Sequence, residues 1–197
     1  MQVLLLRHGL TRGNLERRYI GVTDDPLCPE GIAALRASAP ARWTGTVYVT
    51  PLQRTRQTAD ILFPLARQTE LSGLAEMHFG TFENRNAADM ENDPAYRTWV
   101  DSMCLALCPG GESQEQFVRR VCAAFTEAVT SHPAGLPFFC VCHGGTIMAL
   151  LSRLARPHRD YWDWHVSAGC GYLAHWDGCA LLNPAPVSPA DLQSLFF

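Results

Sequence analysis

Residues 3–6 form a short apolar run, Val-Leu-Leu-Leu, that ends at Arg7-His8-Gly9. A short continuous apolar run bounded by a glycine is typical of a strand buried inside a parallel sheet. The cation and the imidazole therefore stand where this strand ends, and in open α/β sheets ligands bind at that point. The pattern occurs twice more, because Arg54 and His143 also follow segments of strand-like composition.

Strand-like and helix-like segments alternate along most of the 197 residues. Five segments rich in β-branched, aromatic or apolar residues are predicted to be strands: 2–6, 46–50, 138–142, 171–175 and 179–182. Four segments with apolar residues at helical spacing are predicted to be helices: 29–39, 52–66, 113–131 and 146–155. This order predicts a single α/β domain with three α/β/α layers, in which helices cover both faces of a mostly parallel sheet.

Two segments depart from the alternation. Residues 68–111 mix Asn, Gly and Pro with scattered aromatic residues, so we expect loops and short helices that cross the functional edge of the sheet. Residues 183–197 are a Pro-rich tail that we expect to begin in an extended conformation. The tail ends in apolar residues that could dock on the body of the protein or contact a second copy in a homodimer: Leu192, Leu195, Phe196 and Phe197.

The composition favours a globular protein that acts on a small molecule. A net charge of −3 gives no electrostatic basis for binding nucleic acid or an anionic membrane, so neither is expected as a partner. No apolar segment approaches the roughly 18 residues of a membrane span, and the N-terminal run is too short for a secretory signal. The eight cysteines include no C-x-x-C pair, and we expect reduced thiols in a cytoplasmic protein.

Arg7, Arg54, His8 and His143 together have the chemistry of a phosphate site. Arginine presents a planar fork of donors to phosphate oxygens, and a helix that follows a strand directs free N–H groups at the same place. Two arginines and a histidine match the charge of a phosphate monoester without a metal or another cofactor, and the sequence contains no metal-ligand spacing. Singly, His8 could be a loop histidine, Arg54 a solvated helix cation and His143 a core histidine. Their shared place at strand ends favours the phosphate site.

Five motifs, in order from about residue 2 to residue 155, resemble those of the histidine phosphatase superfamily, the phosphoglycerate mutase-like family. The first is R-H-G-x-T-x-x-N over 7–14, followed by Arg18, Gly21, Asp24, Pro26, Leu27 and Gly31. The others are P-L-x-R-x-x-Q-T-A over 51–59, E-x-x-F-G-x-F-E over 76–83, P-G-G-E-S over 109–113 with Phe117, Arg120 and Val121, and H-G-G over 143–145. The resemblance implies the fold of that family.

The resemblance also implies a mechanism. His8 would attack phosphorus and become a phosphohistidine. The phosphoryl oxygens would be held by a set of donors around it: Arg7, Asn14, Arg54, His143 and Gly144. Glu76 would protonate the leaving alcohol and then activate water, with Glu83 as the rival acid.

Departures from the family pattern concern the substrate. Leu10 stands for the usual Glu, Phe82 for Trp and Asn84 for Gly. The short chain and the form of the 76–80 segment favour a phosphatase over a mutase, and within the phosphatases they most resemble those acting on α-ribazole 5′-phosphate, in assembly of the lower cobalamin ligand. A broad sugar or nucleotide phosphatase, a phosphoglycerate mutase and a non-catalytic phospholigand binder stay open as alternatives. We expect the substrate contacts to come from Tyr19, Gly21, His78, Phe79, Glu112 and Ser113.

Overall fold

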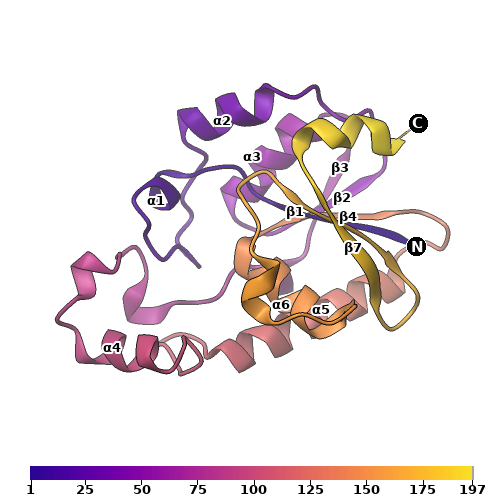
Figure 1. Ribbon diagram of the computed structural model, residues 1–197. Coiled ribbons are helices and arrows are strands. Elements are labelled where there is room, and N and C mark those ends of the chain that lie inside the picture. Colours follow the sequence, from indigo (N-terminus) through magenta and orange to yellow (C-terminus); the bar gives the residue numbers. More distant parts are fainter. Residues whose placement is uncertain (197) are drawn as a thin grey trace.

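Strand β1 (Gln2–Arg7) lies in the middle of a seven-stranded sheet in the computed structural model, which describes residues 1–196 (Figure 1). The strand order is β3-β2-β4-β1-β6-β7-β5. The other strands are β2 (Thr46–Val49), β3 (Arg67–Glu70), β4 (Phe138–Cys142), β5 (Ala155–Arg156), β6 (Gly171–Trp176) and β7 (Leu181–Val187). Only β6 pairs with its neighbours in antiparallel fashion, so the sheet is mostly parallel, as predicted.

Successive residues of β1 point into two separate cores, as the two-residue period of a strand requires. Val3 and Leu5 belong to the core beneath α5 (Gln114–Ser131) and α6 (Gly144–Leu154). Leu4 and Leu6 belong to the core beneath the helices of the opposite face, α2 (Pro29–Arg36) and α3 (Gln53–Leu62). Figure 1 shows the two pairs of helices on either side of the sheet, which confirms the predicted layers.

The long helix α5 is specified locally. Ser113 accepts a hydrogen bond from the Gln116 N–H, and the Gln116 side chain accepts one from the Ser113 N–H. This capping box satisfies two N–H groups that the first turn would leave free. Phe117, Val121 and Phe125 then recur at intervals of four residues and are buried together against the sheet.

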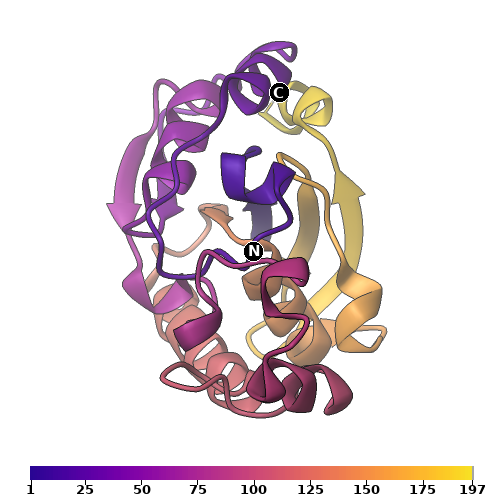
Figure 2. The same cartoon turned by 90° about the vertical axis from the view of Figure 1, so that its left-hand side faces the viewer.

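The register of the parallel strands brings three chain segments to one edge of the sheet. Arg7 at the end of β1 pairs with Cys142 at the end of β4. Val49 at the end of β2 pairs with Val141 of β4. The residues that follow these strands therefore emerge side by side. Figure 2 views this end of the molecule, with α1 (Arg12–Leu15) near the centre and the magenta and pink 68–111 segment below it.

The 68–111 segment contains more regular structure than predicted. It begins within β3 and continues through three short 3₁₀ turns to the helix α4 (Pro94–Asp101). The strand β3 was not predicted, because Arg-Gln-Thr-Glu is a polar edge strand without an apolar pattern. The two-residue strand β5 is too short to leave a pattern.

The Pro-rich tail begins inside the sheet. Strand β7 runs to Val187 and contains Pro184 and Pro186, although the prediction ended this strand at Leu182. β5 covers only the first two residues of β7, so the prolines lie where one side of the strand has no partner within the sheet. Leu192 is completely buried in the core of the α2–α3 face. Phe197 lies outside the described residues, and a homodimer stays a prediction.

All eight cysteines are free thiols, as predicted. Cys140 and Cys142 are buried in the core beneath α5 and α6 and contribute as small apolar side chains. None of the helices in the described chain is long and apolar enough to cross a membrane.

The α2–α3 core should be sensitive to one buried leucine at the end of α3. Leu62 is fully buried there, whereas Leu65, three residues later, is 61% exposed. Leu62→Ala should lower the free energy of unfolding by about 2–5 kcal/mol because it leaves a cavity. The control Leu65→Ala should change it by less than about 0.5 kcal/mol. Urea denaturation of both variants measures this, and equal losses would contradict the assigned packing.

Candidate active site

His8 is buried directly after β1, and its hydrogen bond fixes the ring's tautomer. Its Nδ1 lies 2.6 Å from the Gly9 carbonyl oxygen, which can only accept, so Nδ1 carries the hydrogen. The free electron pair is then on Nε2. Burial lowers the pKa of His8 well below its usual value, and the charges of Arg54 and Arg7 lower it further. The side chain is therefore a neutral imidazole with an available nucleophilic nitrogen.

Arg7 leaves one buried donor unused. Its Nη1 donates to the Val166 carbonyl oxygen at 2.7 Å, while its Nε is buried and has no hydrogen-bond partner among residues 1–196. A Cβ built on Gly144 would lie 3.4 Å from the guanidinium carbon, so Arg7 packs against the first residue of α6. An unpaired buried donor costs about 1–3 kcal/mol, which a bound anion would recover. Burial also lowers the pKa of Arg7.

Arg54, in the first turn of α3, is a fully buried cation. Its guanidinium donates to the carbonyl oxygens of Thr23, Gly21 and Ile20, and its Nε donates to Nδ1 of His143 at 3.3 Å. These four bonds use all but one of the five N–H groups of an arginine. Burial lowers the pKa of Arg54. The side chain thus binds the 20–23 loop and keeps one donor for a ligand.

His143 follows β4, and both of its ring nitrogens are engaged. Nδ1 accepts from Arg54, so Nε2 carries the hydrogen and donates to Oγ1 of Thr50 at 2.9 Å. The ring centroid lies 5.3 Å from that of His8, with the rings 64° apart. Burial lowers the pKa of His143 well below its usual value, and the charge of Arg54 lowers it further. A phosphoryl oxygen that contacts His143 must replace one of these two hydrogen bonds.

Two further donors lie near the ends of β1 and β4. Asn14 uses its Oδ1 to accept from the Thr11 N–H, which leaves the hydrogens of its Nδ2 without a partner in the described chain. The Gly144 N–H, at the start of α6, is likewise without a partner among residues 1–196. The N-terminus of α6 carries a partial positive charge that favours an anion.

Glu76 is the carboxyl group of the site. Its Oε1 accepts from the Met77 N–H at 3.0 Å and its Oε2 from the Gly145 N–H at 2.9 Å. A Cβ on Gly145 would lie 2.3 Å from Oε1, so the glycine gives the carboxyl group its space. The residue is partly exposed, yet burial of the carboxyl group raises its pKa against the opposing effects of the two N–H donors and of Arg54 and Arg7.

Glu83, the rival acid, is occupied by backbone groups. Its two oxygens accept hydrogen bonds from the N–H groups of Gly21, Val22, Thr23 and Phe79. The Thr23 hydroxyl donates to it as well, at 2.8 Å. This carboxylate therefore holds the 21–23 loop against the 79–83 turn. Glu76, whose raised pKa suits proton transfer, is the better candidate for the acid.

Glu112 forms an ion pair that fixes the segment containing Glu76. Arg120 of α5 donates to both Glu112 oxygens at 2.8 Å, and the Glu112 Oε2 also accepts from the His78 N–H. The guanidinium of Arg120 donates in addition to the carbonyl oxygens of Gly73, Ala75 and Glu76. Glu112 and Arg120 both belong to the motif that begins at residue 109, but the motif did not predict that their side chains form an ion pair.

A cavity of about 290 Å³ adjoins the carboxyl group of Glu76. We call it the leaving-group pocket. Its lining is mainly aromatic and apolar and contains no arginine, lysine or histidine: Tyr19, Glu76, Met77, Phe79, Trp99, Cys104, Gln114, Gly145, Met148, Tyr161 and Trp162. Tyr19 organises one wall, because its ring contacts those of Phe79 and Trp99 and its hydroxyl hydrogen-bonds that of Tyr96.

The predicted site residues fall into three groups. His8, Glu76 and the residues predicted to bind phosphate lie around the ends of β1, β2 and β4, while Tyr19 and Phe79 line the leaving-group pocket. The remaining predicted contacts lie outside its lining: Gly21, His78, Glu112 and Ser113. Tyr161 and Trp162 belong to the pocket but to none of the five motifs, so no local pattern in the sequence predicted them. Within the described chain, no three His, Cys, Asp or Glu side chains cluster as a metal site would require.

Comparisons with known proteins agree with this geometry. Residues 3–181 match the sequence profile of the histidine phosphatase superfamily (branch 1). GpmB of Escherichia coli O1:K1, named a probable phosphoglycerate mutase, is 32% identical over 161 residues, which cover 78% of this chain and 74% of GpmB. The adenosylcobalamin/α-ribazole phosphatase of Salmonella typhimurium is 30% identical over 181 residues, which cover 86% of this chain and 88% of that protein. The crystal structure of the α-ribazole phosphatase from Shigella flexneri superposes with a TM-score of 0.80 at 25% identity, covering 93% of this chain and 95% of that one.

The buried histidines should make the folded protein sensitive to acid. Because the folded-state pKa values of His8 and His143 lie below the ordinary value of 6.5, the folded protein binds fewer protons than the unfolded chain as the pH falls through 6.5. Their contribution to the free energy of unfolding should therefore fall between pH 7.5 and pH 5.5. His8→Asn should lessen this fall, as measured by urea denaturation at both pH values.

Glu76 contributes the opposite slope, because a raised carboxyl pKa lowers stability as the pH rises. Glu76 is present in both wild type and His8→Asn, so the difference between their pH dependences reports on His8. The control His158→Asn changes an exposed histidine and should keep the wild-type fall. An equal fall in wild type and His8→Asn would contradict the neutral, buried state assigned to His8.

Proposed function

The chain belongs to the histidine phosphatase superfamily, and from this premise we propose that it is a metal-independent phosphomonoesterase that works through a phosphohistidine at His8. The observation that carries the proposal is the pairing of a neutral His8, with Nε2 free, and two buried arginines that keep unused donors. A nucleophile next to unpaired cations fits an ester that is itself an anion.

In the first step the Nε2 electron pair of His8 attacks phosphorus in line with the leaving oxygen. The P–N bond forms as the P–O bond to the alcohol breaks, and Glu76 transfers its proton to the departing oxygen. The Arg7 Nε, the remaining Arg54 N–H and the Gly144 N–H hold the non-bridging oxygens, with the Asn14 amide as a further donor. These groups are fixed before the reaction, so they stabilise its charge without reorganising.

In the second step Glu76, now ionised, takes a proton from a water molecule. The water oxygen attacks phosphorus, the P–N bond breaks and its electrons return to Nε2 of His8. Inorganic phosphate leaves, and both side chains regain their starting protonation states. A carboxyl group with a raised pKa serves both directions of this proton transfer near neutral pH.

The leaving-group pocket favours an aromatic alcohol. Its lining offers ring faces and thioether groups, and the carboxyl of Glu76 is its only charged group. The carboxylate of a phosphoglycerate would lie there without a cation, next to a second carboxyl group, which is an unfavourable placement. α-Ribazole 5′-phosphate, whose alcohol carries an aromatic base, suits the pocket better. The names of the Salmonella and Shigella relatives support this substrate and hence a role in assembling the lower cobalamin ligand.

The similarity to GpmB supports phosphoglycerate mutase activity as a second candidate. A mutase and a phosphatase would share His8, the arginines and the phosphohistidine, and would differ in the molecule that takes the phosphoryl group in the second step. A non-catalytic phospholigand binder would need the arginines but neither a free nucleophile nor an acid. The reaction product therefore distinguishes the mutase from the phosphatase, and a non-catalytic binder would form no product at all.

Phosphate release is the direct test of the phosphatase. The wild-type protein should hydrolyse both phenyl phosphate and α-ribazole 5′-phosphate, and for each substrate the rate should be the same with and without EDTA. It should not isomerise 3-phosphoglycerate. His8→Ala should lower kcat by at least about a thousandfold, because it removes the nucleophile. The control His175→Ala changes an exposed histidine of β6 and should keep kcat. Activity abolished by EDTA, or full turnover by His8→Ala, would refute the proposal.

Glu76→Gln should separate the two steps. The amide cannot protonate an alkoxide, so kcat for an alkyl phosphate should fall by about 10²–10⁴. With p-nitrophenyl phosphate, whose leaving group is stable as an anion, the first turnover should remain fast and later turnovers should be slow, giving a burst of one p-nitrophenol per enzyme. The control Glu91→Gln changes an exposed carboxylate and should act like wild type. An equal loss on both substrates without a burst would argue against Glu76 as the acid.

A further inference from the structure

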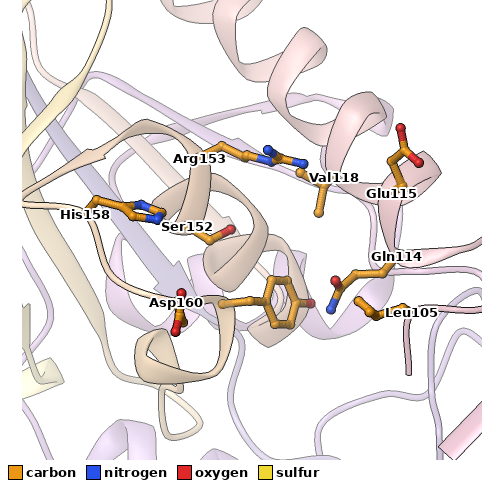
Figure 3. A pocket seen from close by; sticks show the side chains of 9 residues that line it. Leu105, Gln114, Glu115, Val118, Ser152, Arg153, His158 and Asp160 are labelled. Carbon is orange, nitrogen blue, oxygen red and sulfur yellow. The ribbon is translucent and has the colours of Figure 1, made fainter. Parts of the chain in front are cut away.

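A second cavity, of about 450 Å³, lies beside the leaving-group pocket and has no part in the chemistry described above. We call it the distal cavity. It is formed by the start of α5, the end of α6 and the loop that follows β5. Its lining is Leu105, Gln114, Glu115, Val118, Ser152, Arg153, His158, Asp160 and Tyr161. Figure 3 shows His158 and Asp160 on one side of this cavity and Gln114 and Leu105 on the opposite side.

The two cavities adjoin. Gln114 and Tyr161 line both of them, so their side chains stand at the boundary. Tyr161 is held there by a hydrogen bond from its hydroxyl to the Gly145 carbonyl oxygen, at 3.5 Å. If a phosphate ester binds at His8 with the first part of its alcohol in the leaving-group pocket, a larger alcohol would extend past Gln114 and Tyr161 toward the distal cavity.

The distal cavity contains a cation without a partner. Glu115 is neutralised by Arg119, whose Nη2 lies 2.7 Å from its Oε1. Asp160 is tied into the 3₁₀ turn that follows it, because its N–H donates to the Asp163 carboxylate at 3.2 Å and its carbonyl oxygen accepts from the Asp163 N–H. Arg153, in contrast, makes no hydrogen bond or ion pair with any residue from 1 to 196, and the same holds for the imidazole of His158.

The sequence around the cavity adds to this positive character. The segment from Arg153 to Arg159 also contains Arg156, and it has no acidic residue until Asp160. Arg156 donates to the Ala155 carbonyl oxygen, and Arg159 lies over the ring of Trp164 at 4.9 Å. These two arginines thus have local contacts, which leaves Arg153 as the free guanidinium that lines the cavity. A free guanidinium recognises carboxylate and phosphate oxygens through its fork of donors.

We propose that the distal cavity is a second substrate subsite, in which Arg153 and His158 bind an anionic group carried at the far end of an aromatic phosphate ester. The inference rests on the proposed phosphatase activity and extends it. It names a substrate class: phosphomonoesters whose alcohol is aromatic near the phosphate and bears a carboxylate or a second phosphate beyond the ring. An ester without that group uses the leaving-group pocket alone.

A matched pair of substrates tests the subsite. One is a phenyl phosphate with a para-alkyl chain that ends in a carboxylate, and the other ends in the carboxamide, which has nearly the same size and no charge. In wild type, kcat/KM for the carboxylate should exceed that for the carboxamide by about threefold to fivefold, the upper part of the range of an exposed ion pair. The ratio should shrink as salt is raised, because exposed charges are screened.

Arg153→Ala should bring the ratio of the two kcat/KM values close to one, and Arg153→Lys should restore part of it. Arg36→Ala is the matched control, because Arg36 also stands exposed in the last turn of a helix, on the opposite face of the sheet. Like Arg153→Ala, Arg36→Ala removes a positive charge that interacts favourably with the C-terminal end of a helix. It should leave the ratio of the two kcat/KM values as in wild type.

The outcomes separate the inference from the function on which it rests. If wild type hydrolyses both esters with equal kcat/KM, or if Arg153→Ala keeps the wild-type ratio, the subsite is refuted and the phosphatase stands. If wild type hydrolyses neither ester, nor phenyl phosphate, the proposed function itself fails. Arg153 is exposed, so its variants should fold, and a wild-type circular dichroism spectrum checks this.

Discussion

The Arg54 guanidinium is completely buried, yet its hydrogen bonds within the described chain go to carbonyl oxygens and an imidazole and not to a carboxylate. A buried cation without a paired anion is unfavourable, and hydrogen bonds to four neutral acceptors offset part of that cost. Those acceptors belong to the 20–23 loop and to His143, so one side chain joins the loop between α1 and α2 to the turn after β4. The positive potential that remains is what a phosphate group would neutralise.

The same potential sets the protonation of its neighbours. Burial and the two arginine charges both lower the pKa of His8, so the nucleophile is neutral without any carboxylate to orient it. At Glu76 these effects oppose each other: the arginine charges lower the pKa of the carboxyl group, whereas burial raises it and has the larger effect. One cluster of charges therefore favours a free base at His8 while burial keeps an acid available at Glu76.

The sequence allowed the central strands to be predicted, together with the place of the candidate phosphate-binding residues at strand ends, because both depend on local signals. An apolar run predicted β4 with its correct bounds, and the family motifs placed the arginines and histidines at strand ends. β3 escaped prediction because its four residues are polar and only pairing with β2 makes them a strand. The ion pair of Glu112 with Arg120, and the place of Tyr161 between two cavities, arise from contacts distant in sequence that no local pattern encodes.

The central claim is that Nε2 of His8 accepts the phosphoryl group, since Nδ1 is tied to the Gly9 carbonyl oxygen. The most direct measurement is to quench the reaction of Glu76→Gln with p-nitrophenyl phosphate in alkaline denaturant, where phosphohistidine survives. Mass spectrometry then locates the modified residue, and phosphorus NMR identifies the ring nitrogen. The account predicts one phosphoryl group on Nε2 of His8. Phosphate on Nδ1, phosphate on another residue, or turnover without any phosphoenzyme would contradict it.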